Sequence, residues 1–159
     1  MINRKFLFAA SLTALVALAS PLVSQAQSTF DDTQQLIAQI QSDKRAIVLK
    51  GMALNDAQVE AFTPIYDDYQ AKRKVLMQRG VDLVDKYAAN YGSMTDDAAK
   101  KMLKEWFALV DDENDLIQTT SKKMGKVLPA TKVLRFVQIE NKLNTVMRLP
   151  AVRAIPLAE

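Results

Sequence analysis

Residues 54–91, LNDAQVEAFTPIYDDYQAKRKVLMQRGVDLVDKYAANY, form the longest run of the chain with one consistent apolar face. Its apolar residues follow one another at intervals of three, four or seven, which bring side chains to one side of an α-helix. They are Val59, Phe62, Tyr66, Tyr69, Leu76, Leu83, Tyr87 and Tyr91. Asn55 precedes them as a candidate N-cap. The stretch therefore predicts a long amphipathic helix whose apolar face is covered by other helices.

Two residues of this stretch do not suit a regular helix. Pro64 has no backbone N–H, and a proline costs about 3 kcal/mol in a helix interior. Either one helix runs through Pro64 with a kink, or a short helix ends there and Thr63 caps a second one. The unbroken apolar spacing favours the kink. Gly80 lies on the apolar face, where its missing side chain would allow another helix to approach closely, or would only weaken the helix.

A shorter helix is predicted before this stretch, over about residues 32–50. Leu36, Ile40 and Ile47 mark its apolar face, and Gly51 is placed as its C-terminal stop. Because Gly and Ser lie within residues 90–94, this segment predicts the turn that follows the long helix.

Two more helices are predicted after that turn. Thr95 caps the first of them, with Asp96 and Asp97 in its first turn, and Pro129 begins the second. The apolar positions are Ala98, Met102, Trp106, Leu109, Leu116 and Val127 in the former, and Val133, Phe136, Val137, Leu143 and Met147 in the latter. Pro150 and Pro156 bracket a short tail with room for one more turn. The fold class predicted is therefore all-α, with about four helices and a long antiparallel hairpin as its framework.

The first 26 residues have the pattern of a secretory signal peptide. Arg4 and Lys5 precede an uncharged apolar run over residues 6–19, and the small-residue site Ser24-Gln25-Ala26 follows. Cleavage after Ala26 is favoured over cleavage after Ala19, which would shorten the apolar region. An uncleaved anchor is the alternative, but the run is shorter than the ~20 residues that cross a bilayer. We expect an exported, periplasmic protein whose single helical domain spans residues 27–159.

The charge of the chain excludes one class of partner. The net charge of +3 falls to +1 once residues 1–26 are removed, because they carry two basic and no acidic residues. A domain so close to neutral has no electrostatic basis for binding nucleic acid. Contact with a membrane is expected only through an uncleaved signal.

The residue types that support most catalytic and metal sites are absent. The chain has no His and no Cys, which removes the commonest general base, the commonest metal ligand and thiol chemistry. The acidic residues at 111–113 and 115 lack the spacing of a calcium-binding loop and are expected to be a solvated face. The six Met residues after Met1 form no cluster suited to copper. We therefore expect no enzyme, no catalytic residue, no metal and no cofactor.

One motif suggests a relationship. Leu54-Asn55-Asp56-Ala57-Gln58 resembles the Leu-Thr-x-x-Gln motif of the periplasmic Spy and CpxP proteins, with Asn in the capping position of Thr. The segments AFTPIYDDYQ, KYAANYGSMTDDAAK and KVLPATKVLRFVQIENKL resemble a group of uncharacterised exported helical proteins of Gram-negative bacteria. The resemblance implies a helical hairpin, often a dimer with a concave face, and chaperone or envelope-stress work without ATP.

In Spy-like proteins a basic concave face receives clients, and the corresponding candidates here are Lys72, Arg73, Lys74 and Arg79. With apolar neighbours they give a predicted protein-binding surface composed of Phe62, Tyr66, Lys72, Arg73, Arg79, Trp106 and Phe107. The function expected is a non-enzymatic helical binding protein that contacts unfolded clients through this surface. The alternative is a structural or regulatory envelope protein with one dedicated partner. A homodimer is expected because the helices carry more apolar face than one hairpin covers.

Overall fold

The computed structural model describes residues 35, 39–40 and 42–158. The chain divides into two units, Met1–Gln35 and Leu36–Glu159, and nearly all described residues belong to the second. In chain order this unit contains a helix over residues 42–52, α2 (Asp56–Asn90), the short 3-10 helix η1 (Tyr91–Ser93), α3 (Asp96–Met124) and α4 (Ala130–Ala154). The described residues include no strand, so the predicted all-α fold is confirmed. The predicted signal peptide and the start of the predicted helix over 32–50 lie outside the described residues.

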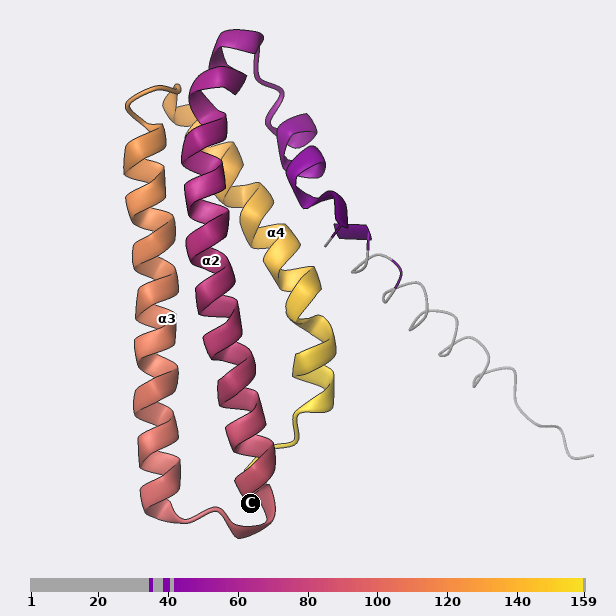
Figure 1. Ribbon diagram of the computed structural model, residues 1–159, viewed down its shortest axis with the longest axis vertical. Helices are drawn as coiled ribbons and strands as arrows, with labels where there is room; N and C mark the ends of the chain where they lie inside the picture. The colour runs from indigo at the N-terminus through magenta and orange to yellow at the C-terminus, as the bar shows by residue number, and fades with distance from the viewer. Residues whose placement is uncertain (1–34, 36–38, 41, 159) are drawn as a thin grey trace, which may run out of the picture. The chain divides into compact units, whose positions relative to one another are not determined.

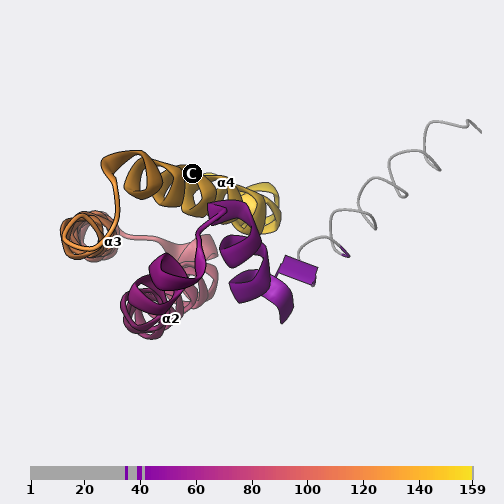
Figure 2. The same cartoon turned by 90° about the horizontal axis from the view of Figure 1, so that it is seen from above.

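The long helices α2 and α3 run antiparallel and side by side, as the sequence predicts, with η1 in the connection between them (Figure 1). Seen from one end, α2, α3 and α4 stand at three corners (Figure 2). The helix over 42–52 lies beside the N-terminal part of α2, and α4 starts at the same end and runs back along α2 (Figure 1). None of the helices in the described ranges is long and apolar enough to cross a membrane.

Side-chain caps fix the starts of the two hairpin helices. The Asn55 side chain accepts a hydrogen bond from the Gln58 amide at 2.9 Å, and the Asn55 amide donates to the Gln58 side chain at 3.2 Å. This reciprocal pair is a capping box, which satisfies two backbone donors that a helix start leaves free. Thr95 caps α3 by accepting from the Ala98 amide at 3.2 Å. α2 continues through Pro64 as a single helix, so the alternative of a break with Thr63 as a cap is wrong.

Three helix ends differ from the predicted ones. The first helix continues past Gly51, and Ala53, just after its end, has a positive φ of 47°. The predicted stop is wrong because α4 supplies donors to the last carbonyls: Lys132 Nζ donates to Ala53 O and Arg135 Nε to Gly51 O, each at 2.5 Å. α3 ends at Met124, so Val127 lies beyond it in the loop. Conversely, α4 continues through Pro150 to Ala154.

The main core lies at one end of the hairpin. Phe136 of α4 packs edge-on against Phe62 at 6.0 Å and Tyr69 at 5.4 Å between ring centroids, while Phe62 and Tyr66 stack at 5.3 Å. The buried residues of this cluster are Val48, Met52, Phe62, Tyr66, Tyr69, Met124, Leu128 and Phe136. They come from the first helix, the first half of α2, the end of α3, the loop that follows it and α4. The far half of the hairpin therefore depends mainly on contacts between α2 and α3.

A buried carboxylate completes this core. Glu140 of α4 is 1% exposed and accepts hydrogen bonds from Lys44 Nζ at 2.9 Å, Tyr69 OH at 3.1 Å and Gln70 Nε2 at 3.2 Å. Burial lowers the pKa of Lys44, against the opposing effect of the Glu140 charge. Burial, reinforced by Glu140, raises the pKa of Tyr69. Glu140 thus joins the first helix and α2 to α4, at the cost of removing its carboxylate from water.

We predict that removing Glu140 alone destabilises the protein more than removing its ion pair. E140M leaves the largely buried Lys44 and Tyr69 OH without their acceptor, and should lower the free energy of unfolding by about 3 kcal/mol. The double variant K44M/E140M should lose clearly less, because no unpaired charge of that pair remains. Urea unfolding of the wild type, both single variants and the double variant measures this cycle. Equal losses in E140M and the double variant would contradict the prediction.

We also predict that Gly80→Ala stabilises the protein. Gly80 is helical, and an added Cβ would lie 3.6 Å from the Leu109 side chain, an ordinary contact. The close approach expected at Gly80 is therefore not so tight that it requires glycine. G80A should raise the free energy of unfolding by about 0.5–1 kcal/mol. Gly51→Ala is the contrast, because its Cβ would meet Ile139 Cδ1 at 3.0 Å. A loss of stability in G80A would refute this account.

Candidate protein-binding groove

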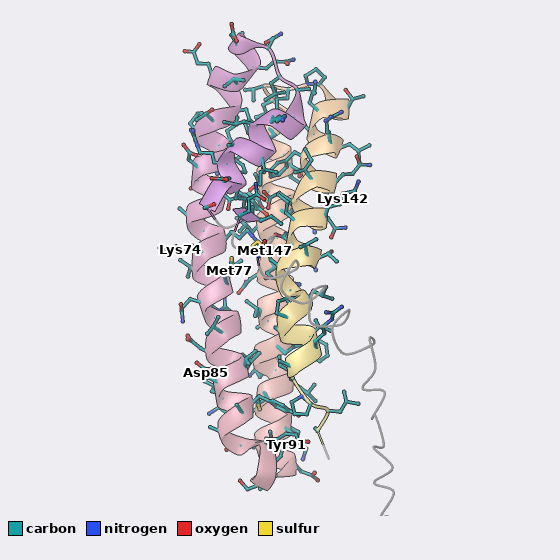
Figure 3. The ribbon with its side chains drawn as sticks, turned by 90° about the vertical axis from the view of Figure 1, so that its right-hand side faces the viewer. Lys74, Met77, Asp85, Tyr91, Lys142 and Met147 are labelled. Carbon is teal, nitrogen blue, oxygen red and sulfur yellow. The ribbon has the colours of Figure 1, made fainter. Side chains whose placement is uncertain are left out.

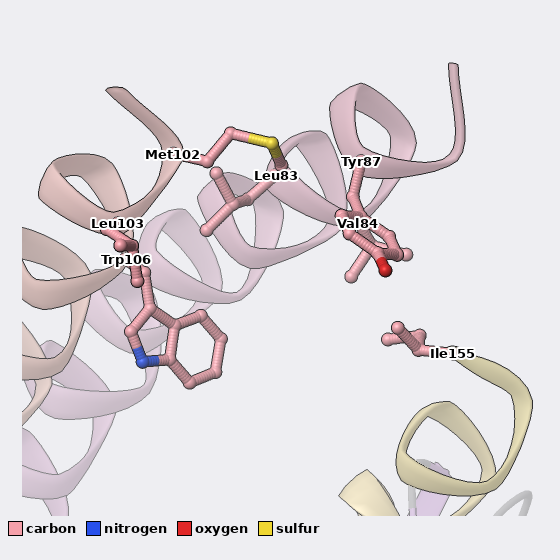
Figure 4. A pocket seen from close by; sticks show the side chains of 7 residues that line it. All are labelled: Leu83, Val84, Tyr87, Met102, Leu103, Trp106 and Ile155. Carbon is pink, nitrogen blue, oxygen red and sulfur yellow. The ribbon is translucent and has the colours of Figure 1, made fainter. Parts of the chain in front are cut away.

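An apolar groove lies at the end of the hairpin away from the main core. It has a volume of about 210 Å³, and no polar surface lines it. Its lining residues are Leu83, Val84 and Tyr87 of α2, Met102, Leu103 and Trp106 of α3, and Ile155 just after α4 (Figure 4). The groove therefore presents one continuous apolar surface drawn from three parts of the fold.

Within the described part of the chain, the groove is lined by no helix other than α2 and α3, which leaves it open. Leu83 is buried as its floor, whereas Trp106 is 50% exposed and Leu103 54%. Trp106 and Leu103 turn toward the groove from α3, and Ile155 faces them from the end of the chain (Figure 4). The tail is held there by Tyr87, whose hydroxyl donates to the Pro156 carbonyl at 2.9 Å. An exposed indole beside exposed leucine is typical of an interaction surface.

The other side of the α2–α3 seam is ionic. Asp68, Arg79 and Lys86 of α2 recur at intervals of eleven and seven residues, which return to one helix face. They meet Lys123 at 3.1 Å, Asp112 at 2.6 Å and Glu105 at 2.7 Å on α3, respectively. These pairs set the antiparallel register of the two helices while contributing little stability, because they are exposed. The hairpin thus has one charged side and one apolar side.

Two carboxylates on the charged side respond to these contacts. Hydrogen bonds from Lys72 and then Lys123 lower the pKa of Asp68. A hydrogen bond from Lys86 lowers the pKa of Glu105. Both groups stay ionised near neutral pH, so the seam keeps its charge pairs. Within the described ranges, no three acidic residues lie close enough together to hold a metal ion.

The structure separates the predicted surface residues into two groups. Phe62, Tyr66 and Arg73 are buried, so their assignment to the surface is wrong. Phe62 and Tyr66 lie on the face of α2 that packs against Phe136, and Arg73 follows one turn after Tyr69 on that same face. Their aromatic and long side chains suit either a core or an interface. Only the position of α4 decides that they belong to the core.

The remaining predicted residues are exposed but do not gather at one place. Lys72 pairs with Asp68 at 2.9 Å, and Arg79 pairs with Asp112, so both lie on the charged side of the seam. Lys74 lies on the outer side of α2, whereas Met77 turns toward the space between α2 and α4 (Figure 3). A single basic face composed of these residues is therefore absent from the described structure.

Trp106 and Phe107 are exposed, as predicted, at 50% and 60%. Trp106 lines the groove, and Phe107 follows it on α3 without lining it. Sequence reasoning missed Leu103, Val84 and Ile155 as groove residues. Leu103 carried a signal, because it is a large apolar residue beside the predicted core positions Met102 and Trp106. Ile155 carried no such signal in the sequence, because its position beside the groove depends on where α4 ends.

The acidic residues over 111–115 are only partly the solvated face that was expected. Asp112 pairs with Arg79 of α2, and Glu113 pairs with Arg148 of α4. This part of α3 therefore also forms ion pairs with arginine side chains of both neighbouring helices, α2 and α4.

No family model, curated protein or solved structure matches this chain.

Proposed function

We propose that this protein is a non-enzymatic periplasmic binding protein, chaperone-like in its action, that holds apolar segments of unfolded proteins in the groove at the open end of its hairpin. The observation that carries this proposal is the apolar groove at Leu83, Leu103 and Trp106, with Trp106 and Leu103 about half exposed. The export pattern of residues 1–26 supports the compartment.

The size and chemistry of the groove suit this kind of client. A volume of about 210 Å³ takes a few apolar side chains, and no charge within it selects one sequence. Binding would remove the indole of Trp106 and the side chain of Leu103 from water, which is the dominant favourable term in association of apolar surfaces. Large apolar side chains are also exposed elsewhere on both hairpin helices, at Met77 and Val81 of α2 and Phe107 of α3. Such a surface suits many weak apolar contacts rather than one polar fit.

A charge placed in the groove tests the proposal. Leu103→Glu should weaken the binding of denatured clients about tenfold, because each bound apolar segment would then desolvate a carboxylate. The readout is suppression of aggregation of several chemically denatured proteins at stoichiometric ratios. Val75→Glu is the matched control, since Val75 is 61% exposed against 54% for Leu103 and does not line the groove. Both variants should unfold within about 0.5 kcal/mol of the wild type.

Two results would contradict the proposal in different ways. If the wild type fails to suppress aggregation of every client, the chaperone-like function is wrong. If the wild type succeeds and L103E equals V75E, the function stands and the groove is the wrong site. A crosslinking pull-down from intact cells that returns one stable partner favours the alternative, an envelope protein with one dedicated partner. Sedimentation of the purified protein tests the expected homodimer.

A further inference from the structure

A second cavity lies between α2, α3 and α4. It has a volume of about 210 Å³ and, unlike the groove, it is lined largely by polar and charged side chains. Arg73 of α2, Glu113 of α3, and Glu140, Asn144 and Arg148 of α4 all face it. Three helices thus bring two cations, two carboxylates and the Asn144 amide together, and the amides of Asn114 and Asn141 line the same partly open cavity.

Arg73 is the unusual member of this set. Its residue is 7% exposed, and its Nε makes no hydrogen bond within the described part of the chain. Arg73 also takes part in none of the ion pairs found among the described residues. A guanidinium is always charged, and burying it without an anion is strongly unfavourable. Buried donors in proteins nearly always have a hydrogen-bond acceptor, so a bound ligand that supplies one would explain the buried Arg73.

The two carboxylates in the cavity are already engaged elsewhere. Glu140 accepts from Lys44 Nζ, Tyr69 OH and Gln70 Nε2. Glu113 is held by both oxygens to one nitrogen of Arg148. Each carboxylate is therefore balanced by one cation, and Arg73 remains as the one uncompensated charge of the cavity. The site is consequently suited to a single negative charge, and a dianion would face repulsion from both glutamates.

The cavity also offers an acceptor. The Oδ1 atom of Asn144 is buried and has no donor among the described residues. Ile117 and Val137 supply apolar wall beside it. A ligand that satisfies these groups needs an anionic end for Arg73, an O–H or N–H for Asn144, and a small apolar body. Since a water molecule occupies about 30 Å³ in the liquid, the volume equals about seven water-sized groups.

We propose that this cavity binds a small organic monocarboxylate that carries a hydroxyl or N–H group. The carboxylate accepts from the Arg73 guanidinium, which suits this planar anion better than an ammonium would. The hydroxyl or N–H donates to Asn144 Oδ1. The cavity and the client groove share no lining residue, so we expect a change in the groove to leave binding here unaltered.

Calorimetric titration of the purified protein with lactate and with propionate tests the proposal. The two monocarboxylates differ only in the hydroxyl, so lactate should bind saturably and propionate more weakly. Arg73→Met should weaken lactate binding about ten- to a hundredfold, the loss of one charge-assisted hydrogen bond. Arg79→Met is the matched control and should keep wild-type affinity, because Arg79 lies on the charged side of the seam, outside this cavity.

A second variant guards against a misfolded R73M. Asn144→Leu should reduce lactate affinity to that of propionate while leaving propionate unchanged. The client-groove variant L103E should bind lactate as the wild type does, which separates failure of this proposal from failure of the proposed function. The proposal is overturned if the wild type binds neither acid saturably, if R73M folds and binds lactate as tightly as the wild type, or if inorganic phosphate binds as tightly as lactate.

Discussion

The edge-on packing of Phe136 against Phe62 and Tyr69 fixes the position of α4, and the rest of the structure depends on it. The contact lies at one end of a hairpin whose helices have 35 and 29 residues, or about 50 and 45 Å at 1.5 Å per residue. A core at one end can bury the apolar faces only near that end. The opposite end is left with exposed Leu103 and Trp106.

Polar contacts follow the same division of the hairpin. Near the core, Glu140 accepts hydrogen bonds from the first helix and α2. Lys132 and Arg135 of α4 donate hydrogen bonds to backbone carbonyls at the end of the first helix. Along the hairpin, exposed ion pairs occupy one side of the seam. Buried charges here specify how the helices are joined, while apolar burial supplies most of the stability.

The two candidate sites arise from different physical causes. The groove exists because apolar residues remain where none of the described helices covers them. The polar cavity exists because three helices converge around Arg73, whose charge no described residue balances. One site therefore offers apolar contact without selectivity. The other offers, among the described residues, one buried cation without an ion pair, Arg73, and one acceptor without a donor, Asn144 Oδ1, which favours a small and specific ligand.

Local chemistry in the sequence determined the helices: the capping box at Asn55, the cap at Thr95 and the apolar spacing over residues 54–91 each act within one or two turns. It also determined that Trp106 and Phe107, as neighbours on a helix, could not both enter one seam. Only the tertiary structure decided which apolar residues are core and which are surface, because Phe62 and Trp106 carry the same pattern until α4 covers one of them. The burial of Arg73 and Glu140 could likewise not be predicted from neighbouring residues alone. Glu140 occupies a position on the apolar face of α4, four residues after Phe136, but its partners Lys44 and Tyr69 come from distant segments.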